Sequence, residues 1–298
     1  MPATQPVTEP SAFWKQLGDE QTAELERTGV QNVKRTLAHR YFTWTSGLRS
    51  DQLWAVVRRT RLRDWPRVFL NFPPRDGMTR WRWFHQVVFT RLLWLYARRI
   101  DRLNVLRRLS EPTFGNPYRI TLKGRLISQD LANSVIELYA MLDDFNFAKP
   151  LRILEIGAGY GRNAYVFLSL FPNCEYTIVD IHPAIDVSRT YLTEVIGDER
   201  VAFLSPEEAL ALPAGLFDLA LNISSFHEMT AAQVSAYFEM IDRTVKGRFY
   251  LKQWKRWHNP TDDVTMTEAS YPFRKGWRRV YSRTAAAQPS FFEALFHL

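Results

Sequence analysis

A short apolar run that ends in a glycine-rich turn constrains this chain more than any other feature. Residues 151–162 read LRILEIGAGYGR, with Glu155 inside the apolar run and three glycines at alternate positions after it. Such a run is typical of a parallel strand covered on both faces, and glycines let the backbone turn at positive φ close to a ligand. Residues 163–170 then resume as a helix. The segment predicts a nucleotide-type site at the carboxyl edge of an α/β sheet.

A second acidic residue follows at the distance that such a site requires. Residues 171–180 read FPNCEYTIVD, which predicts a turn, an apolar strand and a carboxylate, Asp180, nineteen residues after Gly161. Rossmann-like folds place there the acid that accepts the ribose hydroxyls. The dinucleotide fingerprint does not fit, because the third glycine comes one residue early. The pattern E-x-G-x-G-x-G resembles motif I of the class I S-adenosylmethionine-dependent methyltransferases.

Strand and helix patterns alternate after Leu151, as a doubly wound sheet requires. We therefore expect an α/β protein with a Rossmann-like class I methyltransferase core, a mostly parallel seven-stranded sheet and an N-terminal helical lid. Three parts are predicted: a disordered tail (1–10), a mainly helical lid or substrate region (11–127) and the methyltransferase domain (128–298). Strands are predicted at 151–156, 175–181, 200–204, 217–223 and 246–253, with a closing hairpin at 280–282 and 291–296, and helices near 129–142, 161–170, 184–195 and 230–243.

Four blocks of sequence resemble the sugar O-methyltransferase family in the same order. They read GNPYRITLKGRLISQDLANSVIELY, LEIGAGYGRNAYVF, YTIVDIHPAIDVSRTYL and FDLALNISSFHEM, within about residues 115–230. The resemblance implies S-adenosylmethionine as cofactor and methyl transfer to a hydroxyl of a sugar or glycosylated metabolite. Two alternatives stay open: methylation of a non-sugar natural product or an RNA ribose, and a catalytically inactive cofactor-binding protein.

The topology of such a core predicts which residues contact the cofactor. The candidates lie in the glycine turn and at the carboxyl ends of the second, third and fourth strands, namely Glu155, Gly157, Ala158, Gly159, Gly161, Asp180, Ile181, Ser205, Pro206, Asn222 and Ser224. Ser205 is equally well explained as a helix cap. Glu155 and Asp180 have the alternative role of ordinary acids at strand ends around a structural turn.

The catalytic candidates follow the fourth predicted strand. An alcohol oxygen is a poor nucleophile, so a general base helps methyl transfer. His227 has a near-neutral unperturbed pKa, and Glu228 is able either to orient that histidine or to act as the base itself. The structural alternative makes His227 a buried helix-start residue and Glu228 a capping acid. We assign no metal, because an acidic pair such as 262–263 is more often simply solvated.

Two further groups are predicted to contact the acceptor. Gln129 and Asn133 share a polar stripe with Glu137 on the helix that Ser128 caps, directly before the glycine strand. Tyr250, Lys252 and Trp254 lie at the end of the fifth strand, where aromatic faces stack on sugar rings and a cation meets an acidic group. Trp254 is equally well placed as a core residue.

Charge is concentrated in one segment. Residues 51–108 hold fourteen Arg, no Lys and four Asp, a net charge of +10 in a chain of +8. This predicts either an anionic partner or a solvated helix face. We expect a small-molecule or glycan acceptor, with or without an anionic carrier, and no stable nucleic acid partner, because no RNA-binding module is recognisable. No transmembrane segment is expected, and peripheral membrane contact stays open. The N-terminus lacks signal-peptide features, which predicts a cytoplasmic protein.

Overall fold

The centre of the molecule is a seven-stranded sheet. A computed structural model describes residues 7–38, 50–142, 149–197, 199–259, 261 and 263–298. The strand order is β10-β11-β7-β6-β3-β4-β5, in which β11 runs antiparallel to both neighbours and the other pairs are parallel. This confirms the predicted Rossmann-like, mostly parallel sheet. The strands are β3 (Leu151–Ile156), β4 (Cys174–Val179), β5 (Val201–Leu204), β6 (Phe217–Ile223), β7 (Val245–Trp254), β10 (Arg278–Thr284) and β11 (Phe291–His297).

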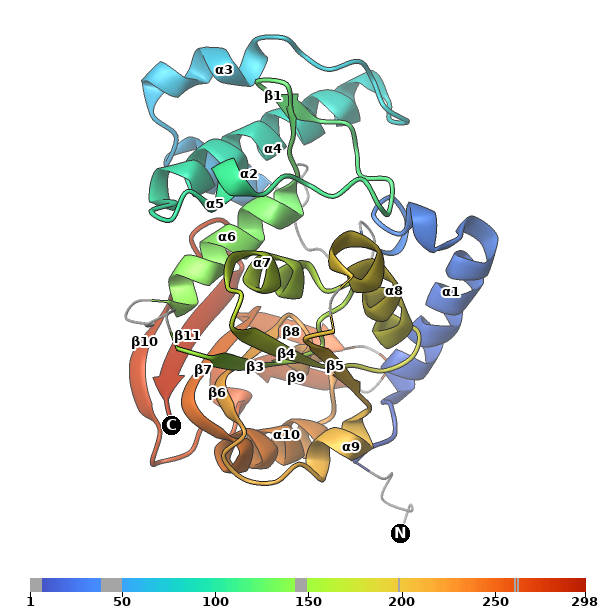
Figure 1. The fold of residues 1–298 in the computed structure, drawn as a ribbon, viewed down its shortest axis with the longest axis vertical. Coiled ribbons are helices and arrows are strands. Elements are labelled where there is room, and N and C mark those ends of the chain that lie inside the picture. Colours follow the sequence, from blue (N-terminus) through green and yellow to red (C-terminus); the bar gives the residue numbers. More distant parts are fainter. Residues whose placement is uncertain (1–6, 39–49, 143–148, 198, 260, 262) are drawn as a thin grey trace.

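Helices cover both faces of the sheet (Figure 1). One face carries α6 (Gln129–Met141), α7 (Arg162–Leu170) and α8 (Ala184–Ile196), and the other carries α9 (Pro206–Leu210) and α10 (Ala231–Thr244). Successive side chains of a strand point to opposite faces. Accordingly Ile153 packs into one apolar cluster, while Leu154 and Ile156 pack into the other. Burial on both faces is the reason that these strands read as continuous apolar runs.

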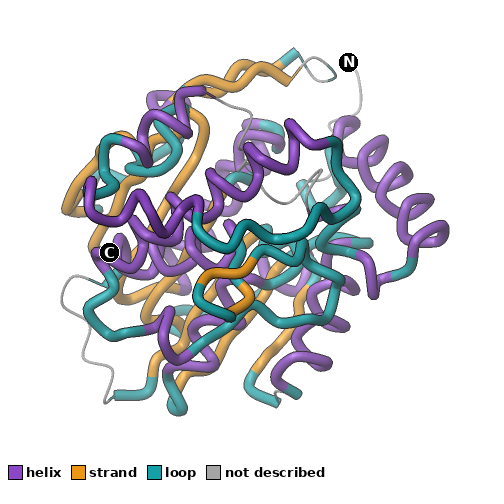
Figure 2. The backbone as a smooth tube through the Cα atoms, turned by 90° about the horizontal axis from the view of Figure 1, so that it is seen from above, coloured by secondary structure: helices purple, strands orange, loops and turns teal. Residues whose placement is uncertain are grey.

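A second layer of helices lies beyond α6 and α7, and Figure 2 shows it from above. We call it the helical cap. It consists of α2 (Ser50–Val57), α3 (Trp65–Phe69), α4 (Arg80–Ile100), α5 (Val105–Arg108) and a small hairpin of β1 (Thr121–Leu122) and β2 (Arg125–Leu126). Helix α4 packs against α6. Helix α1 (Ala12–Thr28) runs separately beside α8, where Gly18 approaches the His182 carbonyl.

Four apolar residues of α4, Phe84, Val88, Leu92 and Leu95, have the spacing of one helix face. Val88, Leu92 and Leu95 are buried, whereas Phe84 is 39% exposed. Arg91 is also buried and only 1% exposed, which its charge does not predict. Its guanidinium reaches backbone carbonyls of α3, of the loop after it and of β1, and these replace the water that an arginine normally requires.

The remaining elements are short. The sequence did not predict the hairpin of β8 (Arg256–Asn259) and β9 (Val264–Thr267), which follows β7. The single-turn helices are η1 (Val30–Asn32), η3 (Leu62–Asp64), η4 (Phe226–Glu228) and η5 (Glu268–Ser270). A glycine is a common point of interruption between helices, so the sequence also predicts the end of a helix near Gly47; this position lies outside the described residues. Within the described ranges, no helix combines the length and apolarity needed to cross a bilayer.

Candidate active site

A cavity lies at the carboxyl ends of β3, β4, β6 and β7. Its walls are completed by α6, the first turn of α7, η4 and N-terminal residues as far as Trp14 in the first turn of α1. Predicted site residues that line it are Asn133, Glu155, Gly157, Ala158, Gly159, Asp180, Ile181, Pro206, Ser224, Glu228 and Lys252. Residues far apart in the sequence thus meet at one edge of the sheet, where open α/β sheets bind ligands.

The glycines of the turn have backbone conformations and close neighbours that exclude a side chain at these positions. Gly157, Gly159 and Gly161 all have positive φ, at 72°, 61° and 87°. A Cβ on Gly157 would lie 2.2 Å from the Ser225 hydroxyl oxygen, so another residue there would force the loops apart. Gly161 is the N-cap of α7 and does not line the cavity; a Cβ there would lie 3.0 Å from Leu192 Cδ1. It therefore allows α7 to pack closely against α8.

Asp180 follows β4 and holds the glycine turn. The backbone N–H of Gly159 donates to its Oδ2 at 3.0 Å, and that of Ile181 donates to its Oδ1 at 2.9 Å. Burial raises the pKa of Asp180 to about 7 despite these bonds, and the nearby Glu228 charge adds to the rise. A carboxylate has about four acceptor sites, so Asp180 keeps capacity for further donors.

Glu155, in the β3 strand, is the second buried acid at the cavity. Its Oε2 accepts from the Tyr176 hydroxyl at 2.7 Å, and its Oε1 accepts from Asn163 Nδ2 at 3.2 Å. Burial raises the pKa of Glu155 to about 7, against the lowering effect of these two hydrogen bonds. Neither donor is charged, so the site leaves this carboxyl poised to accept or release a proton near neutral pH.

A third acid, Glu137 on α6, is fully paired. Two nitrogens of Arg162 donate hydrogen bonds to its carboxylate, Nη1 to Oε2 at 2.6 Å and Nη2 to Oε1 at 3.1 Å. Lys252 Nζ donates to Oε1 at 2.8 Å. Burial would raise the pKa of Glu137, but the charges and hydrogen bonds of Arg162 and Lys252 outweigh it and lower the pKa to about 2. All three side chains line the cavity, and together they carry one net positive charge, which suits a ligand carboxylate.

Ser224 offers a hydroxyl at the end of β6. Its φ is 58°, a conformation that non-glycine residues rarely adopt. Its hydroxyl oxygen is buried at the cavity and has no hydrogen-bond partner among the described residues. Buried hydroxyls are normally satisfied, so an orphaned one on a strained residue indicates a place where a ligand binds.

A chain of amides positions the two catalytic candidates. Asn222 Nδ2 donates to the Ile156 carbonyl at 2.8 Å, which orients the amide, and Gln253 Nε2 donates to Asn222 Oδ1. Gln253 Oε1 therefore faces His227 Nδ1, at 2.8 Å, and accepts its hydrogen. The other ring nitrogen, Nε2, lies 3.3 Å from Glu228 Oε1. This network fixes the orientation of the His227 ring and places its Nε2 next to the Glu228 carboxylate.

The two candidates differ in access. Glu228 lines the cavity, whereas His227 is fully buried behind it and is not among the lining residues. Both belong to η4, directly after β6. Of the two side chains, only Glu228 is therefore in position to contact a molecule in the cavity.

Five other predicted site residues lie away from this cavity. Ser205 caps α9 through a capping box, and Asn222 is part of the amide chain beneath the site. Gln129 lines a smaller adjacent cavity and donates to Thr90 Oγ1 at 3.1 Å. Tyr250 donates to Glu293 in the core, and Trp254 packs on Phe291 with ring centroids 4.3 Å apart.

The sequence did not indicate that the N-terminal residues belong to the site. Val7, Thr8, Pro10, Ser11 and Trp14 line the cavity, although residues 1–10 were predicted to be a disordered tail. The segment is attached to the functional loops, since the Ser11 hydroxyl donates to the Glu228 carbonyl at 3.3 Å and the Gln233 amide donates to the Glu9 carbonyl at 2.6 Å. A proline-rich, polar sequence gives no signal for such contacts.

Asp130 is a second residue that the sequence did not single out. It lines both the main cavity and the adjacent one and accepts a hydrogen bond from the Tyr160 hydroxyl at 2.7 Å. Burial raises its pKa to about 6. Its position next to the predicted residue Gln129 was the only available signal. Both residues line the smaller cavity, and of the two only Asp130 also lines the main one.

Comparisons with known proteins give similarity only among solved structures. No family model and no curated protein matches the chain. A SAM dependent methyltransferase from Aquifex aeolicus is 17% identical, covers 54% of this chain and 88% of its own, and gives a TM-score of 0.40. The mitomycin 7-O-methyltransferase MmcR is 18% identical, covers 57% of this chain and 55% of its own, and gives a TM-score of 0.44. The glycopeptide N-methyltransferase MtfA, complexed with S-adenosyl-L-methionine, is 14% identical, covers 57% of this chain and 94% of its own, and gives a TM-score of 0.42. At these TM-scores the similarities establish neither a ligand nor a reaction for this chain.

Proposed function

We propose that this protein is an S-adenosylmethionine-dependent O-methyltransferase that acts on a hydroxyl of a sugar or glycosylated metabolite. The observation that carries the proposal is the cavity in which the glycine turn, Asp180 and the orphaned Ser224 hydroxyl face one ligand-sized space. The sugar acceptor rests on the four sequence blocks that resemble the sugar O-methyltransferase family.

The residues present fit the cofactor along its length. Asp180 has free acceptor capacity for two ribose hydroxyls, and the glycine turn lets the ligand approach the backbone. Val179, Ile181 and Pro206 line the cavity beside Asp180 and offer an apolar surface for the adenine. The Glu137–Arg162–Lys252 cluster, with its net positive charge, supplies donors for the carboxylate of the methionine part.

Bound S-adenosylmethionine would supply a methyl group activated by a positively charged sulfur. The protein must hold the acceptor oxygen in line with that methyl group, and such positioning supplies a large part of the rate enhancement. Glu228 would accept the hydroxyl proton as the acceptor oxygen bonds to the methyl carbon and the carbon–sulfur bond breaks, with neutral S-adenosylhomocysteine as the leaving group. His227, held as the Nδ1–H tautomer by Gln253, presents Nε2 towards Glu228 at 3.3 Å and helps to orient its carboxylate. We therefore assign Glu228 as the base and His227 as a positioning residue.

The acceptor side of the cavity contains groups suited to a sugar. Trp14 lines it, and an aromatic side chain of this kind stacks on sugar rings. Asn133 and Gln288 add amide groups that hydrogen-bond to hydroxyls. Asp130 forms part of the wall of both cavities, and its carboxyl group adds an acceptor for a hydroxyl at this end of the main one.

The test separates cofactor binding from methyl transfer. Calorimetry with S-adenosylhomocysteine should show that Asp180→Ala weakens binding by roughly 10²- to 10⁴-fold, because two charge-assisted hydrogen bonds are lost. Asp186→Ala, an exposed acid on α8, should bind as the wild type does. Glu228→Gln should leave binding nearly unchanged and lower single-turnover transfer to glycosides by about 10²- to 10⁴-fold. His227→Asn should lose less rate and shift the pH profile.

Unchanged affinity in Asp180→Ala would refute the cofactor assignment. Full transfer activity in Glu228→Gln would refute the base and leave catalysis to positioning. If cofactor binds but no glycoside or nucleotide sugar accepts a methyl group, the sugar acceptor is wrong while the site stands.

A further inference from the structure

The outer face of the helical cap carries a continuous group of aromatic rings, which we call the aromatic cluster: Trp65, Phe69, Phe72, Trp81 and Phe84. Phe84 is its centre, with ring centroids 5.8 Å from Phe72, 6.0 Å from Trp81 and 6.5 Å from Phe69. Trp65 stacks on Phe69 at 6.2 Å. Trp81 is 69% exposed and Phe69 is 47% exposed. Apolar groups this large are normally hidden, so their exposure as one group indicates an interaction surface.

Aliphatic side chains enlarge this surface. Leu62, in η3, is 87% exposed, and Leu70, directly after α3, is 62% exposed. Together with the aromatic cluster they span residues 62–84, within the arginine-rich segment. A solvated helix face, one of the two predictions for this segment, does not account for two leucines and four aromatic rings in water.

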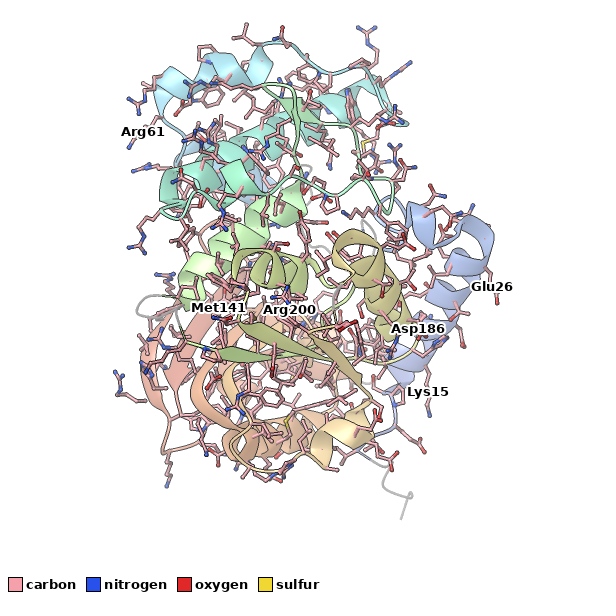
Figure 3. All side chains as sticks on the ribbon, viewed as in Figure 1. Lys15, Glu26, Arg61, Met141, Asp186 and Arg200 are labelled. Carbon is pink, nitrogen blue, oxygen red and sulfur yellow. The ribbon has the colours of Figure 1, made fainter. Side chains whose placement is uncertain are left out.

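Arginines border the apolar surface. Arg75 and Arg80 line the same hollow as Phe72, Trp81 and Phe84, and neither has an acidic partner among the described residues. Arg61 and Arg63 are exposed beside Leu62, and Figure 3 shows Arg61 projecting outward from the cap. Of the acids in this segment, Asp64 pairs with Arg67, and Asp76 pairs with Arg35. The surface therefore combines exposed apolar groups with uncompensated positive charge.

The surface is rigidly supported from below. The buried Arg91 binds the carbonyls of Val68, Leu70 and Asn71, which fixes the chain between α3 and α4. Its guanidinium carbon also lies 5.7 Å from the centre of the Phe72 ring. The exposed rings are thus held in a defined arrangement by a buried charge, as expected of a preorganised binding face.

This surface is separate from the cofactor cavity. None of residues 51–108 in the described part lines that cavity, and the cap forms the end of the molecule farthest from α9 and α10 (Figure 1). An anionic group that binds to this surface would therefore not belong to the part of the acceptor that lies in the cofactor cavity. The arginine-rich surface therefore requires a partner of its own.

We propose that the aromatic cluster and its arginines dock the protein on an anionic lipid surface. Trp81, Phe69 and the two leucines would enter the interfacial region, where aromatic side chains are favoured, while the arginines would meet lipid phosphates. Apolar side chains combined with arginines at one face are the pattern of interfacial membrane binding. Single-stranded nucleic acid, by contrast, stacks its bases on rings that stand open along a groove, whereas these rings stack on one another.

The experiment measures binding of the full chain to vesicles by co-sedimentation. We expect strong binding to phosphatidylcholine mixed with phosphatidylglycerol, weak binding to phosphatidylcholine alone, and loss of binding at high salt. Arg75→Gln with Arg80→Gln should weaken binding by about 25-fold, at about fivefold for each arginine near the surface. The matched control, Arg107→Gln with Arg108→Gln, removes the same charge from α5 and should bind nearly as the wild type does.

The apolar contribution is tested separately. Trp81→Ser should weaken vesicle binding about tenfold, whereas Trp54→Ser, which replaces a 60% exposed tryptophan outside the cluster, should not. Brominated lipids should quench part of the wild-type tryptophan fluorescence, and Trp81→Phe should bind but lose that part. Circular dichroism and S-adenosylhomocysteine affinity should be unchanged in every variant, which keeps this test independent of the proposed reaction.

Several results would overturn the proposal. Equal binding to neutral and anionic vesicles would exclude a role for the arginines. Equal loss in both arginine pairs, with Trp81→Ser unaffected, would indicate unspecific attraction between a basic protein and any polyanion. Tight binding to RNA with no vesicle binding would assign the surface to nucleic acid instead.

Discussion

The helical cap and the sheet edge each bury a charge without an opposite charge beside it, and they do so for different purposes. Arg91 has five N–H donors, and all five bonds go to backbone carbonyls, at 2.8–3.1 Å. Asp180 receives two backbone N–H bonds, one on each oxygen, and keeps further acceptor capacity. A saturated buried charge is structural, whereas one with capacity left is ready for a ligand.

The energetic consequences differ in the same way. Burial lowers the pKa of Arg91 and raises the pKa of Asp180 to about 7, so both charged forms are disfavoured by desolvation. Arg91 is compensated fully within the chain. Asp180 is compensated only in part, which is expected where a site gives up stability in return for function.

The largest expected effect comes from removing the saturated charge. Arg91→Met should lower the free energy of unfolding by about 3–5 kcal/mol, because several buried carbonyls lose their donors and the chain after α3 is released. Arg98→Met, an exposed arginine on the same helix, should change it by less than about 0.5 kcal/mol. Chemical denaturation of both variants measures the difference. A loss below about 1 kcal/mol in Arg91→Met would mean that water satisfies these carbonyls equally well.

Glu137 provides an intermediate case, a buried charge with two opposite charges. Its pKa of about 2 lies below the unfolded value of 4.5, so it stabilises the fold above pH 4.5, and this contribution is lost as the pH falls towards 2. Glu137→Gln should cost about 2–4 kcal/mol at pH 7, since Arg162 and Lys252 are left uncompensated. The cost should shrink in acid.

Denaturation at pH 7 and pH 3 measures this difference, with Glu194→Gln, an exposed acid on α8, as the control. A cost that is independent of pH would show that the lost stability comes from packing rather than from charge.

The sequence predicts the sheet edge better than the cap, and the reason is the range of the interactions. Residues 151–180 form local units, so the apolar runs, the turn and Asp180 could be placed from spacing alone. Ser128 was correctly predicted as the N-cap of α6, because its partner, Leu131, is three residues away. The partners of Arg91 lie 20 to 30 residues away, and no local pattern separates that arginine from its exposed neighbours.

In the candidate active site, too, contacts between residues distant in the sequence could not be predicted. The sequence placed His227 and Glu228 together but could not rank them, because their exposure to the cavity follows from how η4 packs against β7, from which Gln253 binds His227. The polar stripe of α6 was predicted as part of a ligand site, yet the division of Asn133 and Gln129 between two cavities depends on the cap packed above them. Local chemistry identifies candidate residues, and tertiary packing assigns their roles.

The smallest expected effect is the change of folding stability with pH that the Asp180 carboxyl group causes. Because the pKa of Asp180 is about 7 in the fold and about 3.8 when unfolded, the folded state holds the extra proton between these values. The stability that this proton provides is complete below about pH 4 and is lost as the pH rises through 7. Wild-type stability without ligand should therefore fall, relative to Asp180→Asn, by about 1–3 kcal/mol between pH 5 and pH 8. Comparing the variant with the wild type cancels the similar contribution of Glu155.

Ligand binding should reverse this trend. Ribose hydroxyls donate to the ionised form of Asp180, so affinity for S-adenosylhomocysteine should rise as the pH increases through 7, and the ligand should stabilise the wild type most at pH 8. Denaturation of both proteins at pH 5 and pH 8, with and without ligand, measures both slopes. Parallel pH profiles for wild type and variant would show that Asp180 is as fully compensated as Arg91, and the distinction between the two buried charges would then fail.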